Sequence, residues 1–437
     1  MVNLGLNLNR DRFLNLLGKM VAEGENLQNQ PPQFVAKEDL AGRHVLAVLK
    51  PYLRENGGVL DLKYVAYAEG RGNMIIQYKG ENEECPTIAF VGSHMDVVVA
   101  DKKTWKRDPF KMEIDGDIIH GRGTTDCLGH VALLADLFVQ LAEKKPKLNC
   151  TVAGVIIVDE EAGGSRDEAD VGVGRLMKEG ELSFLRRGPV IWLDCADKQP
   201  NIGSGGTVQW ALNVKGKLFH SGFPHKGINA VELAMEISSA LQRHFYEKFP
   251  PHEKEKEYGF ECSSSFKPTQ ISTGEGSVNQ IPSSVTVRGD IRLIPFYDIE
   301  EAMKEIEAKL DEIKEGRFSS LPTRGPDSRF SIEDGSIGSV DLEWTCDPLK
   351  GLACSLDSPG FKALAQATEE VIGHVKPLAD TGSLPLVGDL KANGYDIQTV
   401  GYGVEDAYHA ENEFARISDF EQGMKVLSRI VELVNEQ

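Results

Sequence analysis

Short, nearly continuous apolar segments alternate with amphipathic segments along much of this chain. Polar residues hardly interrupt the segments at 87–92, 152–158 and 189–193, which is typical of strands buried on both faces of a sheet. Between the first two of them, residues 130–145 repeat apolar side chains at the spacing of one helix face. This alternation predicts an α/β domain built on a largely parallel sheet.

From residue 207 to 350 the pattern changes to that of a smaller α+β domain. Two helical segments, 228–247 and 298–315, stand among strands in the order β-α-β-β-α-β, which is the split βαβ arrangement. The strands are predicted at 207–216, 268–273, 284–294 and 339–345.

Beyond this region the first pattern returns. The segments are a helix, a strand and a second helix, at 361–372, 396–402 and 418–434. A chain of 437 residues is also too long for one ordinary core and suits two or three domains. We therefore predict a catalytic domain formed by residues 1–206 and 351–437, interrupted by an inserted domain at 207–350.

Composition argues against several classes of protein. A net charge of −19 disfavours nucleic acid and anionic membrane surfaces as partners, and no apolar run approaches the roughly 20 residues of a membrane helix. The N-terminal residues lack the basic start, apolar centre and cleavage site of a secretory signal, so we expect a cytoplasmic protein. The seven cysteines are scattered without a C-x-x-C pair, which favours reduced thiols over a disulfide framework or a zinc finger.

The motif GSHMDVV at 92–98 ends the first apolar segment with His94 and Asp96. In an extended chain residues i and i+2 point to the same face, so both side chains are aimed at one place. Taken alone, the pair suits a buried histidine with satisfied hydrogen bonds and an aspartate that caps a turn.

Acidic and histidine residues follow the other predicted strands in the same way. They are Asp159, Glu160 and Glu161 after 152–158, Asp194 after 189–193, His409 after 396–402, and Asp126 before the helix that begins near His130. Singly, Asp126 suits a helix cap and the two glutamates a solvated loop, whereas a carboxylate that ends a buried strand loses hydration unless it is paired. Ligands of open α/β sheets bind beyond the carboxyl ends of the strands. The whole pattern therefore predicts a metal site at this edge.

Two histidines with several carboxylates form a nitrogen and oxygen ligand set that suits zinc, cobalt or manganese. A bridging carboxylate permits two ions about 3.5–4 Å apart, which polarise a carbonyl and lower the pKa of a bound water. The adjacent Glu160 and Glu161 suit a division into one ligand and one general base. The chemistry predicted for such a site is the hydrolysis of an amide or an ester.

The motifs GSHMDVV, W…DPF, GRGTTD, DEE and HAENE, in this order, resemble those of a known metallohydrolase family. It contains acetylornithine deacetylase, succinyl-diaminopimelate desuccinylase, aminoacylases and bacterial glutamate carboxypeptidases. The resemblance covers almost the whole chain, and DCLGHVAL, DKQP and GKLFHSG are most similar to the plant-type eukaryotic branch. It implies a zinc-peptidase-like α/β catalytic domain with an inserted ferredoxin-like α+β dimerisation domain, and hence a homodimer.

The resemblance also implies two divalent metal ions, with zinc as the leading expectation and cobalt or manganese as alternatives. It places His94 and Asp194 on one ion, Glu161 and His409 on the other, and Asp126 between them.

Three further roles follow from the resemblance. Asp96 would orient His94 from outside the ligand shell, and Glu160 would act as general base and then pass the proton to the leaving amine. His220 in KLFHSG matches a histidine of the inserted domain that stabilises the oxyanion in the partner subunit's site. Without the family, His220 would be read as a polar loop residue.

Substrate-binding positions are also implied. Arg292 and Asn279 match residues that bind a substrate carboxylate, for which a forked guanidinium is suited. The segment TGSLP matches a glycine-rich substrate loop through Thr381, Gly382 and Ser383. The alternatives are a solvated sheet surface for Arg292 and a simple turn for TGSLP.

The sequence departs from the family in two places. Leu128 and Gly129 stand where relatives commonly have Lys-Gly. Asp194 stands where many deacylases have Glu and several aminopeptidases have Asp. Relatives often hold the peptide after the bridging Asp in cis, and a cis bond between Asp126 and Cys127 would support a strained functional site.

The leading functional expectation is deacylation of an N-acyl amino acid, foremost N2-acetylornithine, giving ornithine and acetate in arginine biosynthesis. The first alternative is a dipeptidase or carboxypeptidase with the same two-metal chemistry, which Asp194 would favour. A non-catalytic binding protein on the same scaffold is a further alternative, against which the intact ligand set and Glu160 argue.

Overall fold

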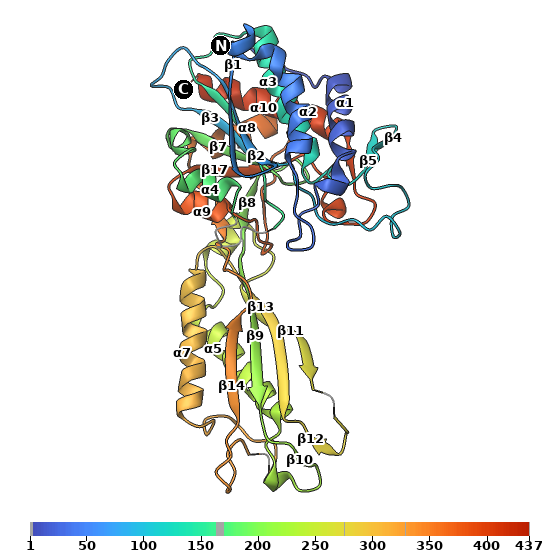
Figure 1. Cartoon of the computed structure of the whole chain (residues 1–437). Helices are drawn as coiled ribbons and strands as arrows, with labels where there is room; N and C mark the ends of the chain where they lie inside the picture. The colour runs from blue at the N-terminus through green and yellow to red at the C-terminus, as the bar shows by residue number, and fades with distance from the viewer. Residues whose placement is uncertain (1–2, 163–169, 275, 328, 437) are drawn as a thin grey trace. The chain divides into compact units, whose positions relative to one another are not determined.

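The computed structural model describes residues 3–162, 170–274, 276–327 and 329–436, which form two compact units (Figure 1). The first unit comprises Met1–Ile202, Cys354–Leu378 and Pro385–Gln437, and the second comprises Gly203–Ala353 and Ala379–Leu384. The second unit therefore contains a short segment, Ala379–Leu384, that the sequence analysis assigned to the catalytic domain.

The first unit is built on a sheet with the strand order β1-β2-β6-β3-β7-β17. These strands are β1 Leu60–Ala68, β2 Arg71–Tyr78, β3 Ile88–His94, β6 Val152–Ile157, β7 Pro189–Leu193 and β17 Asp396–Val400. Strand β3 is parallel to β6 and β7, and β7 is parallel to β17. Strands β3, β6 and β7 are buried along their whole length, as their apolar sequences predict. The carboxyl ends of the four parallel strands consequently share one edge.

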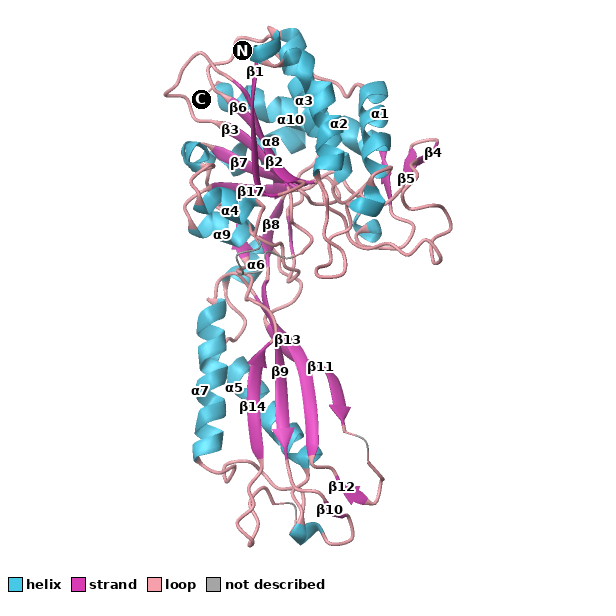
Figure 2. Ribbon diagram, viewed as in Figure 1, coloured by secondary structure: helices cyan, strands magenta, loops and turns pink. Residues whose placement is uncertain are grey.

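The helices of this unit pack against the sheet and one another (Figure 2). They are α1 Arg10–Val21, α2 Asp39–Leu49, α3 Leu128–Lys144, α4 Val173–Lys178, α8 Pro359–Ile372, α9 Val387–Ala392 and α10 Ile417–Asn435. Side chains that cap helix N-termini mark where two of them begin: Asn9 accepts a hydrogen bond from the Arg12 amide before α1, and Ser358 accepts one from the Phe361 amide before α8.

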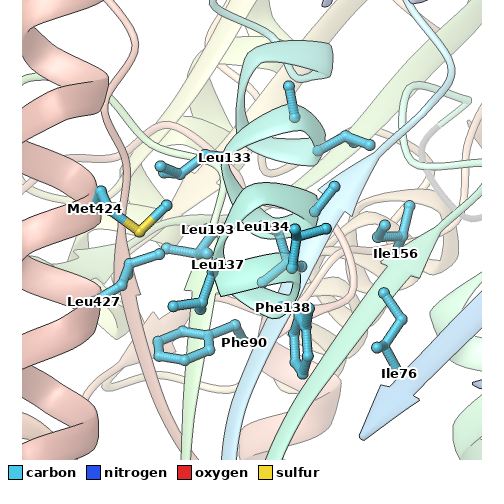
Figure 3. Packing of buried hydrophobic residues seen from close by; sticks show 14 of the residues in the cluster. Ile76, Phe90, Leu133, Leu134, Leu137, Phe138, Ile156, Leu193, Met424 and Leu427 are labelled. Atoms are coloured by element: carbon cyan, nitrogen blue, oxygen red, sulfur yellow. The ribbon is translucent and has the colours of Figure 1, made fainter. Parts of the chain in front are cut away.

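Helix α3 is the centre of the apolar core. Figure 3 shows Leu133 and Leu137 of α3 close to Met424 and Leu427 of α10, with Phe138 on the side of the sheet. Each buried side chain of this size contributes about 1.5–3 kcal/mol. Because α3 begins at Leu128, two residues after Asp126, this packing limits the position of that residue.

Short strands complete the first unit. Strands β4 Glu113–Asp115, β5 Ile118–His120 and β18 Phe414–Arg416 form a separate sheet in the order β18-β5-β4, while β8 Asn201–Ser204, β15 Leu352–Ala353 and β16 Leu378–Ala379 lie at or near the boundaries of the units. The peptide between Asp126 and Cys127 is cis, as it often is in the family that the sequence resembles.

The second unit has a four-stranded antiparallel sheet in the order β11-β13-β9-β14. Its elements are β9 Gly206–Lys215, β10 Phe219–His220, α5 Ala230–Lys248, α6 Lys254–Tyr258, β11 Ser265–Thr273, β12 Gln280–Ile281, β13 Ser284–Leu293, α7 Ile299–Glu315 and β14 Ser339–Trp344. Helices α5 and α7 join this sheet in one apolar core, in which the Trp210 and Phe266 rings stack with centroids 4.6 Å apart. The ferredoxin-like α+β fold expected for the inserted region is confirmed.

Strand β11 forms one edge of this sheet, and most of its residues are exposed. Its Ile271 side chain is among the exposed large apolar residues, as is Met235 on α5. An exposed edge strand with apolar side chains is suited to pairing with another chain.

The prediction that all cysteines are reduced thiols was wrong for one pair. Cys85 and Cys150 form a disulfide with their Cα atoms 4.9 Å apart. They are separated by 65 residues, but each precedes one of two strands, β3 and β6, that pair in parallel with Ile88 opposite Val152. The cysteines outside this disulfide are Cys127, Cys195, Cys262, Cys346 and Cys354.

None of the helices in the part of the chain that the structure describes combines the length and apolar character needed to cross a membrane.

Candidate metal centre

The candidate centre lies at the carboxyl edge of the parallel strands of the first unit. His94 is the last residue of β3, and Asp194 directly follows β7. The loops after β6 and β17 carry the two glutamates and His409, and Asp126 lies just before α3. Two loop residues, Asp159 and His409, adopt positive φ angles of 63° and 53°. Such angles are uncommon outside glycine and are concentrated at functional sites.

Asp126 lies between the two histidines and presents one oxygen to each. Its Oδ1 is 3.0 Å from Nε2 of His94, and its Oδ2 is 3.1 Å from Nε2 of His409. His409 Nε2 is also 3.2 Å from Oε2 of Glu161, while His94 Nε2 is 3.6 Å from Oδ1 of Asp194. The structure thus brings together these five residues, each predicted from the sequence.

The hydrogen bonds of His94 identify which ring nitrogen carries its proton. Nδ1 lies 3.0 Å from the carbonyl oxygen of Asp96 and 3.3 Å from its Oδ1. Both oxygens are acceptors, so Nδ1 donates to them and Nε2 is the nitrogen directed at the centre. Nε2 faces carboxylate oxygens of Asp126, Asp194 and, at 3.8 Å, Glu160. Such a set of acceptors requires a cation, either a second ring proton or a metal ion, and it fits a divalent metal.

Two carboxylates of the centre have one oxygen without a hydrogen bond. Oε1 of Glu161 and Oδ1 of Asp194 are buried and have no hydrogen-bond partner among the described residues. Burying such atoms without a partner is costly. Ligand atoms of His94, Asp126 and Glu161 all lie within 4.8 Å of one another, close enough to hold an ion that would satisfy them.

Burial also changes the pKa values of the centre. It raises the pKa of Glu160 well above its ordinary value, that of Glu161 to about 7 and that of Asp194 to about 6, and nearby carboxylates add to the effect. For Asp126, burial is outweighed by hydrogen bonds from the two histidines, which lower its pKa. Hydrogen bonds to Asp126 and Glu161 raise the pKa of His409 to about 10. Buried acids that compete for so few protons favour a bound cation.

Asp96 connects His94 to the loop after β6. Besides the contact with His94 Nδ1, its carboxylate accepts the backbone N–H groups of Glu160 at 3.2 Å and Glu161 at 2.9 Å. Asn29 Nδ2 donates a further bond of 2.8 Å to Asp96. One buried carboxylate thus orients a histidine and fixes the two glutamates at the same time.

A buried ion pair supports this loop from the other side. Arg71 binds Glu38 through both Nε and Nη2, with a shortest distance of 2.6 Å, and its Nη2 is 3.0 Å from Oδ1 of Asp159. The same oxygen of Asp159 accepts a hydrogen bond of 2.9 Å from Nδ2 of Asn29. The amide of Asn29 therefore links Asp96 to the Arg71–Glu38 pair.

Glu413 connects the segment around Asp126 to the loop that carries the second histidine. Its carboxylate accepts backbone N–H bonds from Gly123 at 3.0 Å, Thr125 at 2.8 Å and Asp126 at 3.0 Å. The fourth donor is Nη1 of Arg122 at 2.8 Å, and both members of this ion pair are buried. Charge-assisted bonds of this kind are about twice as strong as neutral ones.

Asn29, Glu38, Arg71 and Glu413 were not predicted from the sequence as part of the site. Glu413 belongs to the HAENE motif, which was a usable signal, but Asn29, Glu38 and Arg71 precede β3 in segments without a recognised motif. Their roles depend on hydrogen bonds between residues far apart in the chain, such as the bond from Asn29 to Asp159, 130 positions later.

The other predicted residues lie in the second unit. His220 and Asn279 are both exposed. They lie near each other, because the backbone N–H of Ser221 donates a hydrogen bond of 2.9 Å to the carbonyl oxygen of Asn279. Nε of Arg292 donates a hydrogen bond of 2.8 Å to Oδ2 of Asp290, and its Nη1 is 3.5 Å from Oγ of Ser383. Ser383 belongs to the short segment that also contains Thr381 and Gly382. The backbone N–H of Gly205 donates a hydrogen bond of 2.7 Å to the carbonyl oxygen of Gly382 in this segment.

Fold and site together define a hydrolase with an α/β catalytic domain of the zinc-peptidase type and a ferredoxin-like insertion. Residues 90–433 match peptidase family M20/M25/M40, and the chain belongs to this family. It is 48% identical to a Dictyostelium discoideum protein named acetylornithine deacetylase, over 98% of both chains. It is 47% identical to an Arabidopsis thaliana protein of the same name, covering 97% of this chain and 96% of the other.

Solved structures share the fold at much lower identity. The aminopeptidase PepT from Bacillus cereus superposes with a TM-score of 0.69 at 16% identity, over 98% of this chain and 99% of that one.

Proposed function

We propose that this chain is a metal-dependent amidohydrolase that removes the acetyl group of N2-acetylornithine and releases ornithine and acetate. The observation that carries the proposal is the position of Asp126, with one oxygen toward each histidine. Two divalent ions at this position would also satisfy the unpartnered oxygens of Glu161 and Asp194. The choice of substrate is supported by the two relatives named acetylornithine deacetylase.

In this proposal His94 and Asp194 hold one ion, Glu161 and His409 hold the other, and Asp126 is shared. Zinc is the leading candidate, with cobalt and manganese as alternatives, because nitrogen and carboxylate ligands suit all three. Divalent ions bound there supply Lewis acidity, which polarises an amide carbonyl.

Glu160 is the proposed general base. It lies in the loop after β6, beside the ligand cluster, with its Oε2 3.8 Å from Nε2 of His94. The carboxylate takes a proton from the attacking water and delivers it to the nitrogen of the leaving amine. A carboxyl whose pKa is raised by burial is suited to holding a proton between these two steps. Asp96 assists by keeping the lone pair of His94 directed at the centre.

Glu160→Gln tests the assigned base. We expect metal content to be unchanged and kcat to fall by about 10²–10⁴-fold, which is the usual contribution of a general base. The same substitution at Glu179, which pairs with Arg175 on the surface, serves as the control and should leave kcat unchanged. Unchanged turnover in the Glu160 variant would remove this residue from the mechanism.

We propose that substrate recognition involves Asn279, Arg292 and the segment formed by Thr381, Gly382 and Ser383. Arg292 would grip the substrate carboxylate with its guanidinium fork. We also propose a homodimer formed through the second unit, for which the exposed edge strand β11 is suited. In that dimer His220 would stabilise the oxyanion in the partner subunit's site. Sedimentation of the protein and of its Ile271→Lys variant tests the dimer.

Arginine biosynthesis and a cytoplasmic location complete the proposal, and cell fractionation tests the location. A second candidate function is a dipeptidase or carboxypeptidase, favoured by Asp194 at the end of β7.

Amine release by the zinc- or cobalt-loaded protein separates these functions. The substrates are N-acetylornithine, N-acetylmethionine and several dipeptides. We expect N-acetylornithine to be preferred by orders of magnitude. Preference for a dipeptide would replace the deacetylase proposal by the peptidase, and no hydrolysis of any substrate by protein that holds two metals would contradict both.

A further inference from the structure

Cys127 and His130 lie beside the metal centre, yet the proposed reaction uses neither. Both side chains are fully buried, and they belong to the DCLGH segment that begins α3. One ligand atom each of His94, Cys127 and Asp194 lies within 4.8 Å of the other two. A sulfur atom therefore stands next to two of the proposed metal ligands.

The hydrogen bonds of His130 show that this sulfur accepts a hydrogen bond. The backbone N–H of Tyr402 donates to Nε2 of His130 at 2.8 Å, so Nε2 carries no proton. In the neutral ring the proton is therefore on Nδ1, which lies 3.5 Å from Sγ of Cys127. His130 donates this proton to the sulfur. An N–H group directed at a sulfur is a typical outer partner of a metal-bound thiolate.

The thiol of Cys127 has one hydrogen, which it donates to the Leu193 carbonyl oxygen at 3.5 Å. That hydrogen leaves none for the carboxylate of Asp194, which also has a ligand atom within 4.8 Å of the sulfur. Oδ1 of Asp194 is buried without a hydrogen-bond partner among the residues described, and it lies 3.6 Å from Nε2 of His94. A cation placed among the three donor atoms satisfies all of them at once.

We propose that Cys127 is a thiolate ligand of the ion held by His94 and Asp194. On binding, the S–H bond breaks, a sulfur–metal bond forms, and the proton is released to solvent. The inference rests on the metal binding proposed above. It makes the two ion positions chemically different, because sulfur favours softer ions such as zinc or cobalt, whereas Glu161 and His409 form a nitrogen and oxygen position that also suits manganese.

Spectroscopy of the unaltered protein tests this assignment without relying on a variant. With cobalt bound, we expect a sulfur-to-cobalt charge-transfer absorption in the near ultraviolet. With zinc bound, X-ray absorption should show one sulfur at about 2.3 Å for every two ions, beside nitrogen and oxygen at about 2.0–2.1 Å. Two bound ions without a sulfur neighbour would overturn the inference and leave the proposed hydrolase standing. Absence of bound metal would overturn both.

Cys127→Ser and Cys354→Ser form a matched pair of variants, since both thiols are buried in the first unit. Cys127→Ser should lose the charge-transfer band and release one proton fewer on binding. Loss of an outer partner alone lowers metal affinity by about 10–100-fold, so we expect the zinc affinity of one position to fall at least tenfold. Cys354→Ser should match the parent in all three measurements. A band that persists in Cys127→Ser, or disappears equally in both variants, would contradict the assignment.

Discussion

The two histidines of the metal centre are held in contrasting ways. The side chain of His94 is fully buried, whereas that of His409 is 57% exposed. His94 ends a central strand and is oriented by Asp96, which itself accepts three further hydrogen bonds. His409 lies in a loop and contacts Asp126 and Glu161.

This difference separates a deep half of the site from an outer half. In the deep half, charges interact at low dielectric, and removal of one partner leaves the others buried without compensation. In the outer half, water replaces a lost partner at little cost. We therefore expect stability to depend mainly on the deep half, and access for the substrate and exchange of the ion to depend on the outer half.

The largest expected effect comes from removing each histidine in the presence of a chelator. His94→Ala should lower the free energy of unfolding by about 3–5 kcal/mol, because Asp126 and Asp194 lose a buried partner. His409→Ala should lower it by about 1 kcal/mol or less. Urea unfolding monitored by circular dichroism measures both values, and equal losses would refute the distinction between the two halves.

Glu413→Gln should have the next largest effect. The substitution keeps the size of the side chain but leaves Arg122 buried without its anion, which should cost about 3 kcal/mol and reduce metal affinity by displacing Asp126. Glu421→Gln is the matched control, because Glu421 pairs with Arg10 at the surface and should cost less than about 1 kcal/mol. Denaturation of the two variants side by side gives the comparison, and similar costs would contradict the role of Glu413.

Asn29→Ala examines the support behind Asp96. The loss of two donated hydrogen bonds should reduce zinc affinity and kcat by about 10–100-fold, as for other outer partners of metal ligands. KM should change little, since Asn29 is buried behind the ligands. Asn56→Ala, at an exposed amide, should leave both quantities unchanged. A change confined to KM would place Asn29 in the substrate pocket instead.

The smallest expected effect is a reversal of pH dependence. The raised pKa values of Glu161, about 7, and Asp194, about 6, mean that the metal-free folded state binds protons that the unfolded state does not. Its stability should therefore increase by about 1–2 kcal/mol as the pH falls from 7.5 to 5.5. The raised pKa of His409 contributes an amount that is constant below pH 6.5 and is lost progressively between pH 6.5 and about 10, so it acts in the same direction as the two acids over this range.

With zinc bound, the same protons compete with the metal, so stability should decrease over this range. Thermal unfolding at several pH values, with chelator and with zinc, gives the two slopes. Slopes of the same sign would show that these carboxyl groups do not bind the ion.

Much of the fold follows from local pattern. The continuous apolar runs predict β3, β6 and β7, because strands buried on both faces need no alternation, and helical spacing predicts α3, α5 and α7. The ligand candidates were found because each follows one of these strands.

Other parts of the fold and site could not be predicted in this way. Strand β1, Leu60–Ala68, mixes exposed and buried residues, since it forms an edge of the sheet, and it was missed together with α2. Glu413 acts through backbone amides nearly 290 positions earlier. Cys85 and Cys150 meet only because β3 and β6 are neighbours. Long-range pairing of this kind leaves no periodic signal in the sequence.

The most direct test of the account is a zinc titration of the metal-free protein in which bound metal and N-acetylornithine hydrolysis are measured together. Asp126 shared between two histidines predicts two zinc ions per chain and full activity only after the second has bound. Asp126→Ala should bind at most one and be inactive. Full activity with a single ion, or two ions retained by Asp126→Ala, would contradict the shared carboxylate at the centre of this account.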